Sequence, residues 1–146
     1  MQEITLKKLE DKDISGVARI ELSCFSEPWS ENSLKMLTET NAFGIVCYDG
    51  DVAASYGGMI CVLDEGQITN IATLPEFRRR GLAEKTLCAM LKEANARGLS
   101  FVTLEVRESN EPAIALYQRN GFEIMGKRSN FYRKPTEAAL IMEKKL

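Results

Sequence analysis

The stretch from residue 67 to residue 106 most constrains the fold, because it reads as strand, helix and strand with a clear break after each element. Residues 67–73 form the first predicted strand, which Pro75 ends. A helix with one apolar face follows a glycine-containing turn, and Gly98 is its natural stop. The apolar positions of that helix are Ala83, Leu87, Met90, Leu91 and Ala94. Residues 101–106 alternate as a second strand, so this part of the chain requires a sheet with a helix packed against it.

The remaining elements continue the same pattern. Turns are predicted at residues 49–51 and 64–66, where Asp and Gly gather. The other predicted strands are residues 4–9, 43–48, 52–63, 122–128 and 138–143, and the other predicted helices are residues 11–22, 30–37 and 111–120. This order predicts an α/β (α+β) fold, with a mixed central sheet of about six or seven strands and helices on both faces.

The length and the charge of the chain narrow its class. A core built from 146 residues buries roughly 70% of the surface that the unfolded chain exposes, which suits one domain. No linker or repeat divides the sequence, so residues 1–146 are predicted to form a single domain. The 19 basic and 21 acidic residues give a net charge of -2. A general nucleic-acid binder normally carries a basic excess, so this class is not expected.

The chain contains no histidine. This excludes Ser-His-Asp and Cys-His nucleophile systems, zinc sites with a histidine ligand, and a histidine general base. Proton transfer near neutral pH therefore falls to carboxylates of altered pKa, tyrosine, lysine, cysteine or water.

The four cysteines lie in apolar stretches and have neither C-x-x-C nor metal-ligand spacing. They are Cys24, Cys47, Cys61 and Cys88. We expect buried free thiols in a reducing cytosol, with no disulfide and no metal site. Residues 1–9 have no long apolar core of the kind found in a secretion signal, and no stretch approaches the roughly 20 apolar residues of a membrane span. We therefore expect a cytoplasmic protein.

The turn before the long helix has the features of a phosphate-binding loop. Three arginines, at positions 78, 79 and 80, precede Gly81, and the small Ala83 leaves room beside it. The free N–H groups and partial positive charge of a helix N-terminus suit phosphate, and Gly81 permits close backbone approach. A solvated basic turn is the alternative, since a short charge run is commonly no more than that. The turn is neither a Walker loop nor a G-x-G-x-x-G loop.

With this loop the sequence resembles a known family. Residues 78–83, Arg-Arg-Arg-Gly-Leu-Ala, fit the R/Q-x-x-G-x-G/A signature of the GCN5-related N-acetyltransferases (GNAT), and the order of elements resembles that fold over essentially the whole chain. Three further stretches are similar to the RimI-type group of ribosomal-protein-alanine N-acetyltransferases: residues 25–30, residues 70–72, and residues 104–122 with Leu-Glu-Val-Arg-Glu-Ser-Asn and Leu-Tyr-Gln-Arg-Asn-Gly-Phe. The resemblance implies acetyl transfer from acetyl-CoA to the N-terminal alanine of a small-subunit ribosomal protein.

The same resemblance implies which residues bind acetyl-CoA, the co-substrate. The backbone of Ile71, Ala72 and Thr73 would pair with the pantetheine arm, and one amide there would face the thioester oxygen. The loop would wrap the pyrophosphate, chiefly through main-chain N–H groups, and it consists of Arg79, Arg80, Gly81, Leu82, Ala83 and Glu84. Asn110 would hydrogen-bond coenzyme A. Helix N-capping is the alternative for Asn110, because it lies directly before a predicted helix, and the sequence leaves both roles open.

Glu105 is a candidate base from its position alone. Strand alternation places it on the opposite face from the apolar residues Val102, Leu104 and Val106. In an interior strand, burial would raise the pKa of this carboxyl toward the working range. An exposed strand end, or pairing with an arginine such as Arg107, is the alternative reading from the residues. The family resemblance assigns Glu105 as the general base.

Tyr117 lies on the next predicted helix. A tyrosine in such a position is usually core or interface, with its hydroxyl hydrogen-bonded. The resemblance instead assigns it the protonation of the departing coenzyme A thiolate. The implied mechanism is direct transfer in a ternary complex, in which Glu105, with or without a bridging water, removes the amine proton before attack. An α-amine with a pKa of about 7.7–8.0 asks less of a base than a lysine at about 10.4. No metal and no covalent enzyme intermediate are required.

Two positions near the end of the chain depart from the family pattern. Where the family usually carries paired tyrosines and an acidic pair, this sequence has Phe131-Tyr132 and Glu137-Ala138. This segment borders the peptide groove in the family, so Phe131 and Ala138 put peptide specificity in question. Four acidic residues would favour a basic peptide end, and solvated loop acids are the alternative. They are Glu27, Glu31, Asp64 and Glu65.

Three functions remain to be compared. The first is N-terminal acetylation of a ribosomal protein peptide, the second is acetylation of a lysine or a small amine, and the third is a catalytically idle acetyl-CoA-binding scaffold. The presence of both Glu105 and Tyr117 argues against the third. We expect a ribosomal protein N-terminal peptide as the partner, no nucleic acid, no membrane, and a monomer or weak dimer.

Overall fold

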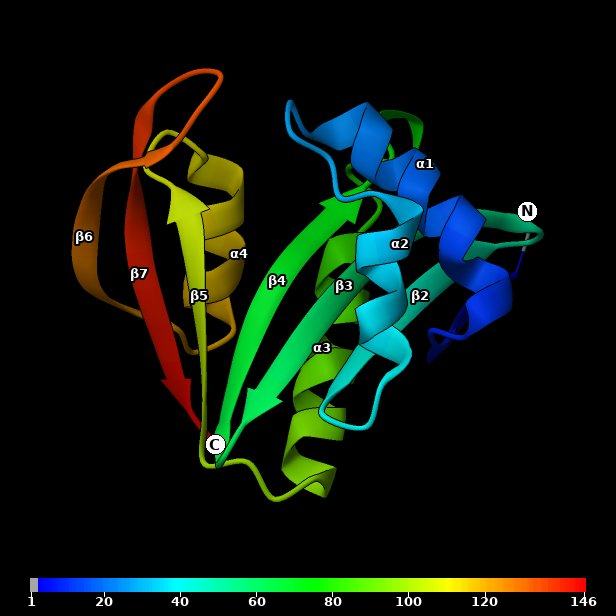
Figure 1. Cartoon of the computed structure of the whole chain (residues 1–146), viewed down its shortest axis with the longest axis horizontal. Helices are drawn as coiled ribbons and strands as arrows, with labels where there is room; N and C mark the ends of the chain where they lie inside the picture. Colours follow the sequence, from blue (N-terminus) through cyan, green and yellow to red (C-terminus); the bar gives the residue numbers. More distant parts are fainter. Residues whose placement is uncertain (1–2) are drawn as a thin grey trace.

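A single seven-stranded mixed sheet runs through the computed structural model, which describes residues 3–146 (Figure 1). The strands are β1 (Ile4–Lys8), β2 (Ala42–Asp49), β3 (Val52–Val62), β4 (Glu65–Thr73), β5 (Phe101–Arg107), β6 (Glu123–Tyr132) and β7 (Glu137–Lys145), in the spatial order β1-β2-β3-β4-β5-β7-β6. The helices are α1 (Ile14–Cys24), α2 (Glu31–Leu34), α3 (Leu82–Ala96) and α4 (Glu111–Arg119), with short 3₁₀ turns η1 (Asp11–Asp13), η2 (Lys35–Thr38) and η3 (Pro75–Phe77). The predicted α/β class and strand number are confirmed.

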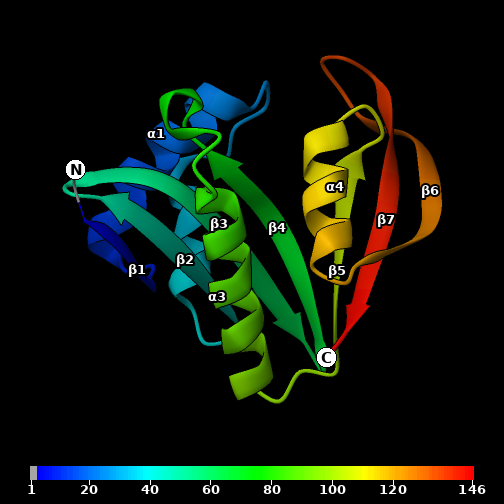
Figure 2. The ribbon, with the colours of Figure 1, turned by 180° about the vertical axis from the view of Figure 1, so that it is seen from behind.

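The helices cover both faces of the sheet, as expected. Helices α1 and α2 lie on the face toward the viewer in Figure 1, and α3 and α4 lie on the other face, which Figure 2 shows from behind. One core forms beneath α3 and α4 and includes Leu87, Met90 and Leu116. A second core forms beneath α1 and α2 and includes Ile20 and Leu34. The apolar spacing of each helix therefore marks the face that it buries.

The sheet splits between β4 and β5. These strands pair in parallel only at Glu65–Phe101, Gly66–Val102 and Gln67–Thr103. Beyond this point they diverge, and the opening between them is the V-shaped gap at the centre of Figure 1. Strand β4 remains paired with β3, and β5 remains paired with β7, so each keeps one free edge toward the split.

Several of the predicted helix ends are correct, whereas the strand predicted at residues 122–128 extends to Tyr132. Ser30 caps α2 by accepting a hydrogen bond from the Ser33 amide at 3.1 Å. Gly98 and Gly121 take positive φ angles of 76° and 93° just beyond α3 and α4, as helix C-terminal residues commonly do. Pro112 lies in the first turn of α4.

Three expectations about the elements are wrong. Residues 11–13 form a 3₁₀ turn, and the α-helix begins only at Ile14. From the sequence, Leu22 counts among the helically spaced apolar residues of that helix, but it is 70% exposed. Residues 65 and 66 belong to β4 rather than to a turn, because the chain reverses at residues 63–64.

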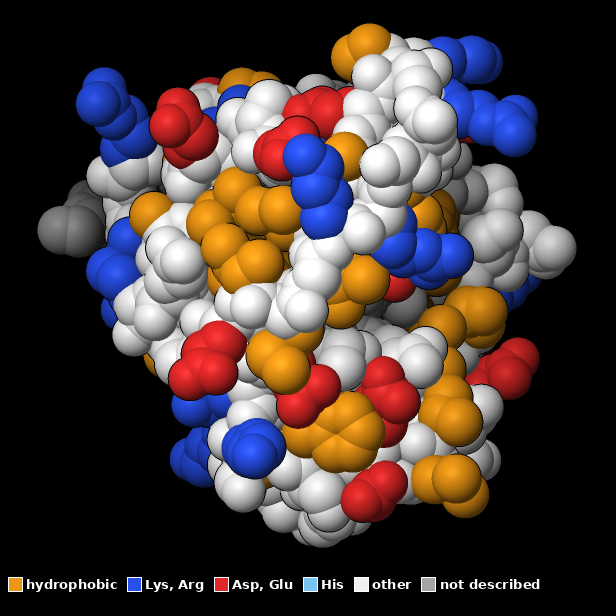
Figure 3. Space-filling model, turned by 90° about the vertical axis from the view of Figure 1, so that its left-hand side faces the viewer, with side chains coloured by type: hydrophobic (Ala, Val, Ile, Leu, Met, Phe, Trp, Pro, Cys, Tyr) orange, Lys and Arg blue, Asp and Glu red, His pale blue; other side chains and the backbone are white. Residues whose placement is uncertain are grey.

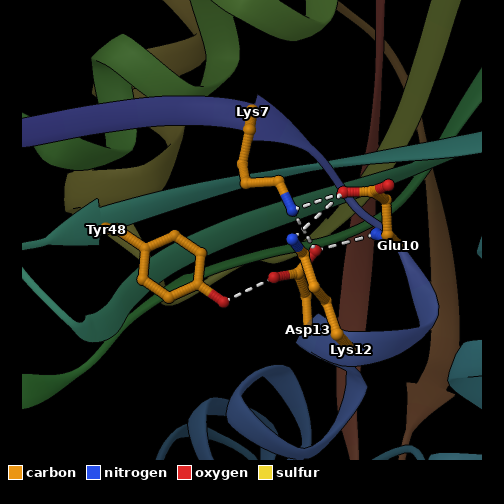
Figure 4. Close-up of polar contacts among 5 residues, drawn as sticks. All are labelled: Lys7, Glu10, Lys12, Asp13 and Tyr48. Carbon is orange, nitrogen blue, oxygen red and sulfur yellow. Dashed lines mark hydrogen bonds and ion pairs between the residues drawn. The ribbon is translucent and has the colours of Figure 1, made fainter.

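The Asp13 side chain holds the connection between β1 and α1 in place through its hydrogen bonds (Figure 4). Its carboxylate is 2% exposed and accepts hydrogen bonds from Lys7 Nζ at 2.7 Å, from the Glu10 amide at 2.8 Å and from the Tyr48 hydroxyl at 2.5 Å. Burial alone would raise the pKa of Asp13, but these donors outweigh it and hold that pKa below its ordinary value of 3.8. The cluster fixes the start of α1 against the sheet.

The expected burial of the cysteines is partly wrong. All four thiols are free. Cys47 is buried and Cys24 and Cys61 are half-buried, but Cys88 is exposed on the outer face of α3. Within residues 3–146, no helix combines the length and apolar character that crossing a membrane demands.

Candidate active site

Two adjoining cavities fill the split between β4 and β5. The larger has a volume of about 440 Å³ and the smaller about 360 Å³. They share six lining residues, which are Cys24, Phe25, Ile71, Asn110, Ala113 and Tyr117. The larger cavity also reaches Glu105, whereas the smaller reaches Ala83 at the start of α3. A ligand can therefore extend from the helix N-terminus to the Glu105 side without leaving the split.

The N-terminus of α3 offers free backbone donors. Its N-cap residue, Gly81, has a φ of 74°, and no side chain caps the helix. A Cβ at Gly81 would meet no atom within 4 Å, so the space in front of the first turn is open. Uncapped N–H groups and the helix dipole make such an end an anion site.

The three arginines of this loop are not all free to meet an anion. Arg80 is paired with Asp49 at 2.8 Å, and Arg78 Nε donates to the Thr73 carbonyl at 3.1 Å. Of the three, only Arg79 has a guanidinium that meets no partner within residues 3–146, and its φ is positive at 65°. Two of the three arginines therefore hold the loop in shape, and one is free to meet an anion.

The other loop residues can contribute mainly through their backbone. Leu82 is buried, and the Glu84 carboxylate is engaged by Arg119 at 3.4 Å and by Asn120 at 3.1 Å. Ala83 lines the smaller cavity. The expectation that residues 79–84 act chiefly through main-chain N–H groups stays a prediction.

The free edge of β4 presents some backbone groups of residues 71–73 to the split and withholds others. The Leu74 amide donates across the sheet to Ala54 at 2.8 Å. Alternation in an antiparallel pair then turns the Ala72 amide toward β3 as well, and turns those of Ile71 and Thr73 toward the split. Of the three residues assigned to acetyl-CoA, Ile71 and Thr73 therefore have available amides.

Glu105 occupies the opposite wall, and its expected burial is wrong. The predicted alternation of β5 is correct, because Val102, Leu104 and Val106 are buried on the other face. The Glu105 side chain, however, is 38% exposed, because β4 has already diverged at this level and leaves it facing the cavity. Its nearest cation is Arg128, at 3.9 Å, and not Arg107.

Tyr117 stands at the junction of the two cavities. Its ring packs edge-on against Phe122 at a centroid distance of 5.7 Å. Tyr117 is buried in the core beneath α3 and α4, as the core interpretation expected, but its hydroxyl makes no hydrogen bond within residues 3–146. Burial, followed by the nearby Tyr132, raises the pKa of Tyr117 well above its usual value of 10, so the hydroxyl stays protonated at neutral pH and can act as a donor.

Asn110 keeps both of its predicted roles open. Its side chain caps α4 by accepting a hydrogen bond from the Ala113 amide at 3.3 Å, so the capping role is confirmed. The residue also lines both cavities, so its amide nitrogen can still meet a ligand.

Arg107 organises the wall formed by the β6–β7 connection, a role that the sequence interpretation missed. Its guanidinium donates to the Pro135 and Arg133 carbonyls, each at 2.9 Å, and pairs with Glu137 at 3.2 Å. It also lies 4.5 Å from the ring centroid of Tyr132, which lines the larger cavity. Burial, then the charge of Glu105, raises the pKa of Tyr132 to about 12.

The departure at Phe131 lies outside the larger cavity. Phe131 is 40% exposed and packs edge-on against Tyr132 with 5.0 Å between the centroids. Figure 3 faces this side of the molecule, where apolar side chains emerge among charged ones. Ile124 and Met125 of β6 are also exposed. Phe131 therefore reaches the cavity through the ring of Tyr132, and also through Arg128, whose guanidinium lies 5.0 Å from the centroid of the Phe131 ring and pairs with Glu105.

A buried carboxylate on α1, Glu21, also supports the site and was not singled out from the sequence. It accepts hydrogen bonds from Trp29, Tyr56 and Asn70, and two of these, Trp29 and Asn70, line the larger cavity. Its position was a usable signal, because Glu21 lies four residues after Val17 on the apolar stripe of α1. Separately, no cluster of three potential metal ligands occurs within residues 3–146.

The chain is similar to known acetyltransferases over nearly its full length. The model of the acetyltransferase (GNAT) family matches residues 14–122. A Bacillus subtilis protein named putative [ribosomal protein bS18]-alanine N-acetyltransferase is 39% identical over 142 residues, which cover 94% of this chain and 92% of the relative. The crystal structure of the ribosomal-protein-S18-alanine N-acetyltransferase from Escherichia coli superposes with a TM-score of 0.92 at 32% identity, covering 98% of this chain and 94% of that one. NAA60 from Arabidopsis thaliana, solved in complex with acetyl-CoA, shares the fold with a TM-score of 0.90 at 15% identity, with 99% of each chain covered.

Proposed function

The chain belongs to the acetyltransferase (GNAT) family, and we propose that it transfers the acetyl group of acetyl-CoA to the N-terminal alanine amine of ribosomal protein bS18. The observation that carries the substrate assignment is the match to bS18-alanine N-acetyltransferases over 94% of the chain. The geometry supports the chemistry, because Glu105 and Tyr117 line one cavity in the split of the sheet.

Acetyl-CoA is the co-substrate of the family, and the split fits it. The uncapped first turn of α3, with open space in front of Gly81, suits the pyrophosphate. The available amides of Ile71 and Thr73 suit the pantetheine arm and the thioester oxygen. A donor that is set in place before the oxygen gains charge stabilises the transition state by roughly 3–4 kcal/mol. Asn110, at the junction of the two cavities, is positioned to donate to the arm.

Glu105 acts as the base in this mechanism. Its carboxylate opens into the larger cavity, so it can accept the proton that the α-amine must lose before its lone pair attacks the thioester carbon. The C–S bond then breaks, and the electron pair leaves on the sulfur of coenzyme A. An α-amine with a pKa of about 7.7–8.0 is already partly neutral near pH 7, so it needs less help from a base than a lysine amine with a pKa of about 10.4.

Tyr117 donates the second proton. Its hydroxyl remains protonated at neutral pH because burial raises its pKa, and no protein acceptor within residues 3–146 engages it. The protonated hydroxyl can donate a hydrogen bond to the departing thiolate, and any proton that it gives to the sulfur is replaced from solvent. The proton lost by the amine is left on Glu105 and returns to solvent when the product leaves.

Acetylation of a lysine or of a small amine is the alternative within the same family. Both alternatives use the same co-substrate site and the same two residues, so the geometry of the split does not separate them. The 25–30 loop and the β6–β7 connection line part of the larger cavity, which has a volume of about 440 Å³. A cavity of this size favours the end of a peptide chain over a small free amine. A scaffold without activity is disfavoured, because it has no use for an unpartnered hydroxyl and an open carboxylate in one cavity.

The test is mass spectrometry of two peptides incubated with the protein and acetyl-CoA. The first is the N-terminal peptide of bS18 with a free alanine amine, and the second is the same peptide with that amine blocked and a lysine left free. We expect one acetyl group on the alanine amine and none on the blocked peptide. Acetylation of lysine alone would refute the proposed acceptor and leave the family assignment intact.

A further inference from the structure

The buried carboxylate of Glu21 is bound entirely by neutral donors. It is 0% exposed, and it accepts the Trp29 amide at 2.8 Å, Asn70 Nδ2 at 2.9 Å and the Tyr56 hydroxyl. No lysine or arginine within residues 3–146 lies at ion-pair distance from it. Burying a carboxylate without a cation is costly, so these three hydrogen bonds are what stabilises it there.

This arrangement determines which way the Asn70 side chain faces. A carboxylate oxygen accepts hydrogen bonds and does not donate, so the Asn70 amide must turn its NH₂ group toward Glu21. Its carbonyl oxygen, Oδ1, then lies at the other end of the amide plane. Oδ1 has no hydrogen-bond partner within residues 3–146, and it is not one of the buried unpartnered oxygens, which are Asp49 Oδ1 and Thr69 Oγ1. Since Asn70 lines the larger cavity, this leaves a free acceptor facing that cavity.

A bulge in β4 puts Asn70 on the correct face for this contact. Ile68 and Ile71 pack in the core beneath α3, whereas Ala72 packs in the core beneath α1. Strict alternation would place residues 68 and 70 on the same face. The pairing of β4 with β3 shifts between Gly57 and Met59, and the extra residue of β4 turns Asn70 toward α1 and Glu21.

Gly58 makes room for the bulge. A Cβ at this position would lie 2.6 Å from Thr69 Oγ1 and 2.8 Å from a methyl carbon of Leu37. Any larger residue would therefore press on the bulged segment. Gly58, the bulge and the buried Glu21 together direct the carbonyl oxygen of Asn70 into the cavity that Glu105 also lines.

We propose that Asn70 Oδ1 receives an N–H of the acceptor amine, and that Glu21 is the positioning residue that keeps this oxygen facing the cavity. The inference deepens the proposed function and rests on it. A primary amine that has given one proton to Glu105 still carries two N–H groups, and a neutral acceptor can hold one of them without competing for the proton. Holding the amine in this way directs its lone pair toward the thioester.

Glu21 also links Asn70 to the 25–30 loop, which forms one side of the larger cavity. The same carboxylate binds the backbone N–H of Trp29, in the 25–30 loop that lines the larger cavity. The loop and the Asn70 oxygen are thus fixed relative to one another through one group. A substrate that seats against the loop places its amine at the oxygen.

The sharpest test exchanges the two functional groups. In Glu21→Gln, the new NH₂ group faces Asn70, so the Asn70 amide turns over and presents its own NH₂ to the cavity in place of an acceptor. We expect kcat/KM for the peptide to fall about tenfold, the value of one hydrogen bond, while KM for acetyl-CoA stays unchanged. Combining Glu21→Gln with Asn70→Asp restores an acceptor to the cavity, and we expect most of the lost kcat/KM to return.

The readouts keep a structural role apart from the proposed one. If the combined variant is no better than Glu21→Gln while both melt like the wild type, the proposal is wrong. Should Glu21→Gln fail to fold, Asn70→Ala decides the matter, since an unchanged kcat/KM for the peptide in that variant also overturns it. All ratios are taken on whichever peptide the wild type acetylates, the alanine-initiated one or the lysine control. Failure of the proposed acceptor is therefore seen in the wild type, and failure of this inference only in the variants.

Discussion

Each wall of the split has one glutamate, and the two side chains differ in burial and in the number of hydrogen bonds that they accept. On the α1–β4 wall, Glu21 is fully buried and accepts three hydrogen bonds. On the β5 wall, Glu105 is 38% exposed and has only the distant Arg128 at 3.9 Å. The sequence interpretation expected burial at the second position, and the structure has it at the first.

The difference separates holding from reacting. A carboxylate that accepts three hydrogen bonds is fixed in place, and because Glu21 is fully buried, neither substrate nor solvent can reach it to deliver a proton. A carboxylate that opens into a cavity can reach both substrate and solvent. A buried carboxylate at a site can therefore be a positioning group as readily as a catalytic one. Whether substrate and solvent can reach its oxygens decides between the two roles.

The largest expected effect is on the exposed wall. Glu105→Gln keeps the shape of the side chain and removes its ability to accept a full proton, so we expect kcat to fall about 10²- to 10⁴-fold. Stability should change by less than about 0.5 kcal/mol, because the side chain is exposed and weakly paired. Steady-state kinetics on the peptide, together with thermal melting, measure both. If Glu21→Gln lowers kcat more than Glu105→Gln does, the assignment of the two walls is reversed.

Helix α1 supplies a matched control for a buried carboxylate away from the split. Asp13, at the other end of the helix, is as buried as Glu21 and also accepts a tyrosine hydroxyl, but it is paired with Lys7 and lines neither cavity (Figure 4). We expect Asp13→Asn to cost about 2–3 kcal/mol of unfolding free energy, since it weakens hydrogen bonds to a buried charge. In chemical denaturation it should lower the midpoint, while kcat/KM of the folded protein stays at the wild-type value.

The pH dependence of Asp13→Asn follows from the sign of the shift. The pKa of Asp13 is lower in the folded protein than its ordinary 3.8, so its ionised form stabilises the fold above that value. This contribution is lost as the pH falls through the folded-state pKa. We therefore expect the gap in stability between wild type and Asp13→Asn to be constant near neutral pH and to narrow below about pH 4. A gap that does not narrow in acid would mean that the charge of Asp13 does not contribute.

Local pattern predicted the elements well, because each depends on neighbours in sequence. The alternation of β5 and the glycine stops after α3 and α4 were correct for this reason. The exposure of Glu105 was not predictable in this way, since it depends on where β4 diverges from β5. The same holds for Arg80, whose partner Asp49 is 31 residues away, and for Glu21 and Asn70, which are 49 residues apart. Contacts of this range are set by tertiary packing, and they determined most of the errors at the site.

The smallest expected effect belongs to Tyr117, which both cavities share. Tyr117→Phe removes the hydroxyl and keeps the ring that packs on Phe122, so the fold should be preserved. A thiol with a pKa of about 8.5 leaves readily as a thiolate, so the proton from Tyr117 gives only modest help, and we expect kcat to fall about tenfold. Release of free coenzyme A thiol during turnover measures this loss. A fall as large as that of Glu105→Gln would mean that bond breaking at sulfur, and not proton removal from the amine, limits the reaction. In that case the contrast between Glu21 and Glu105 would bear on how the amine is bound, and not on the step that limits the rate.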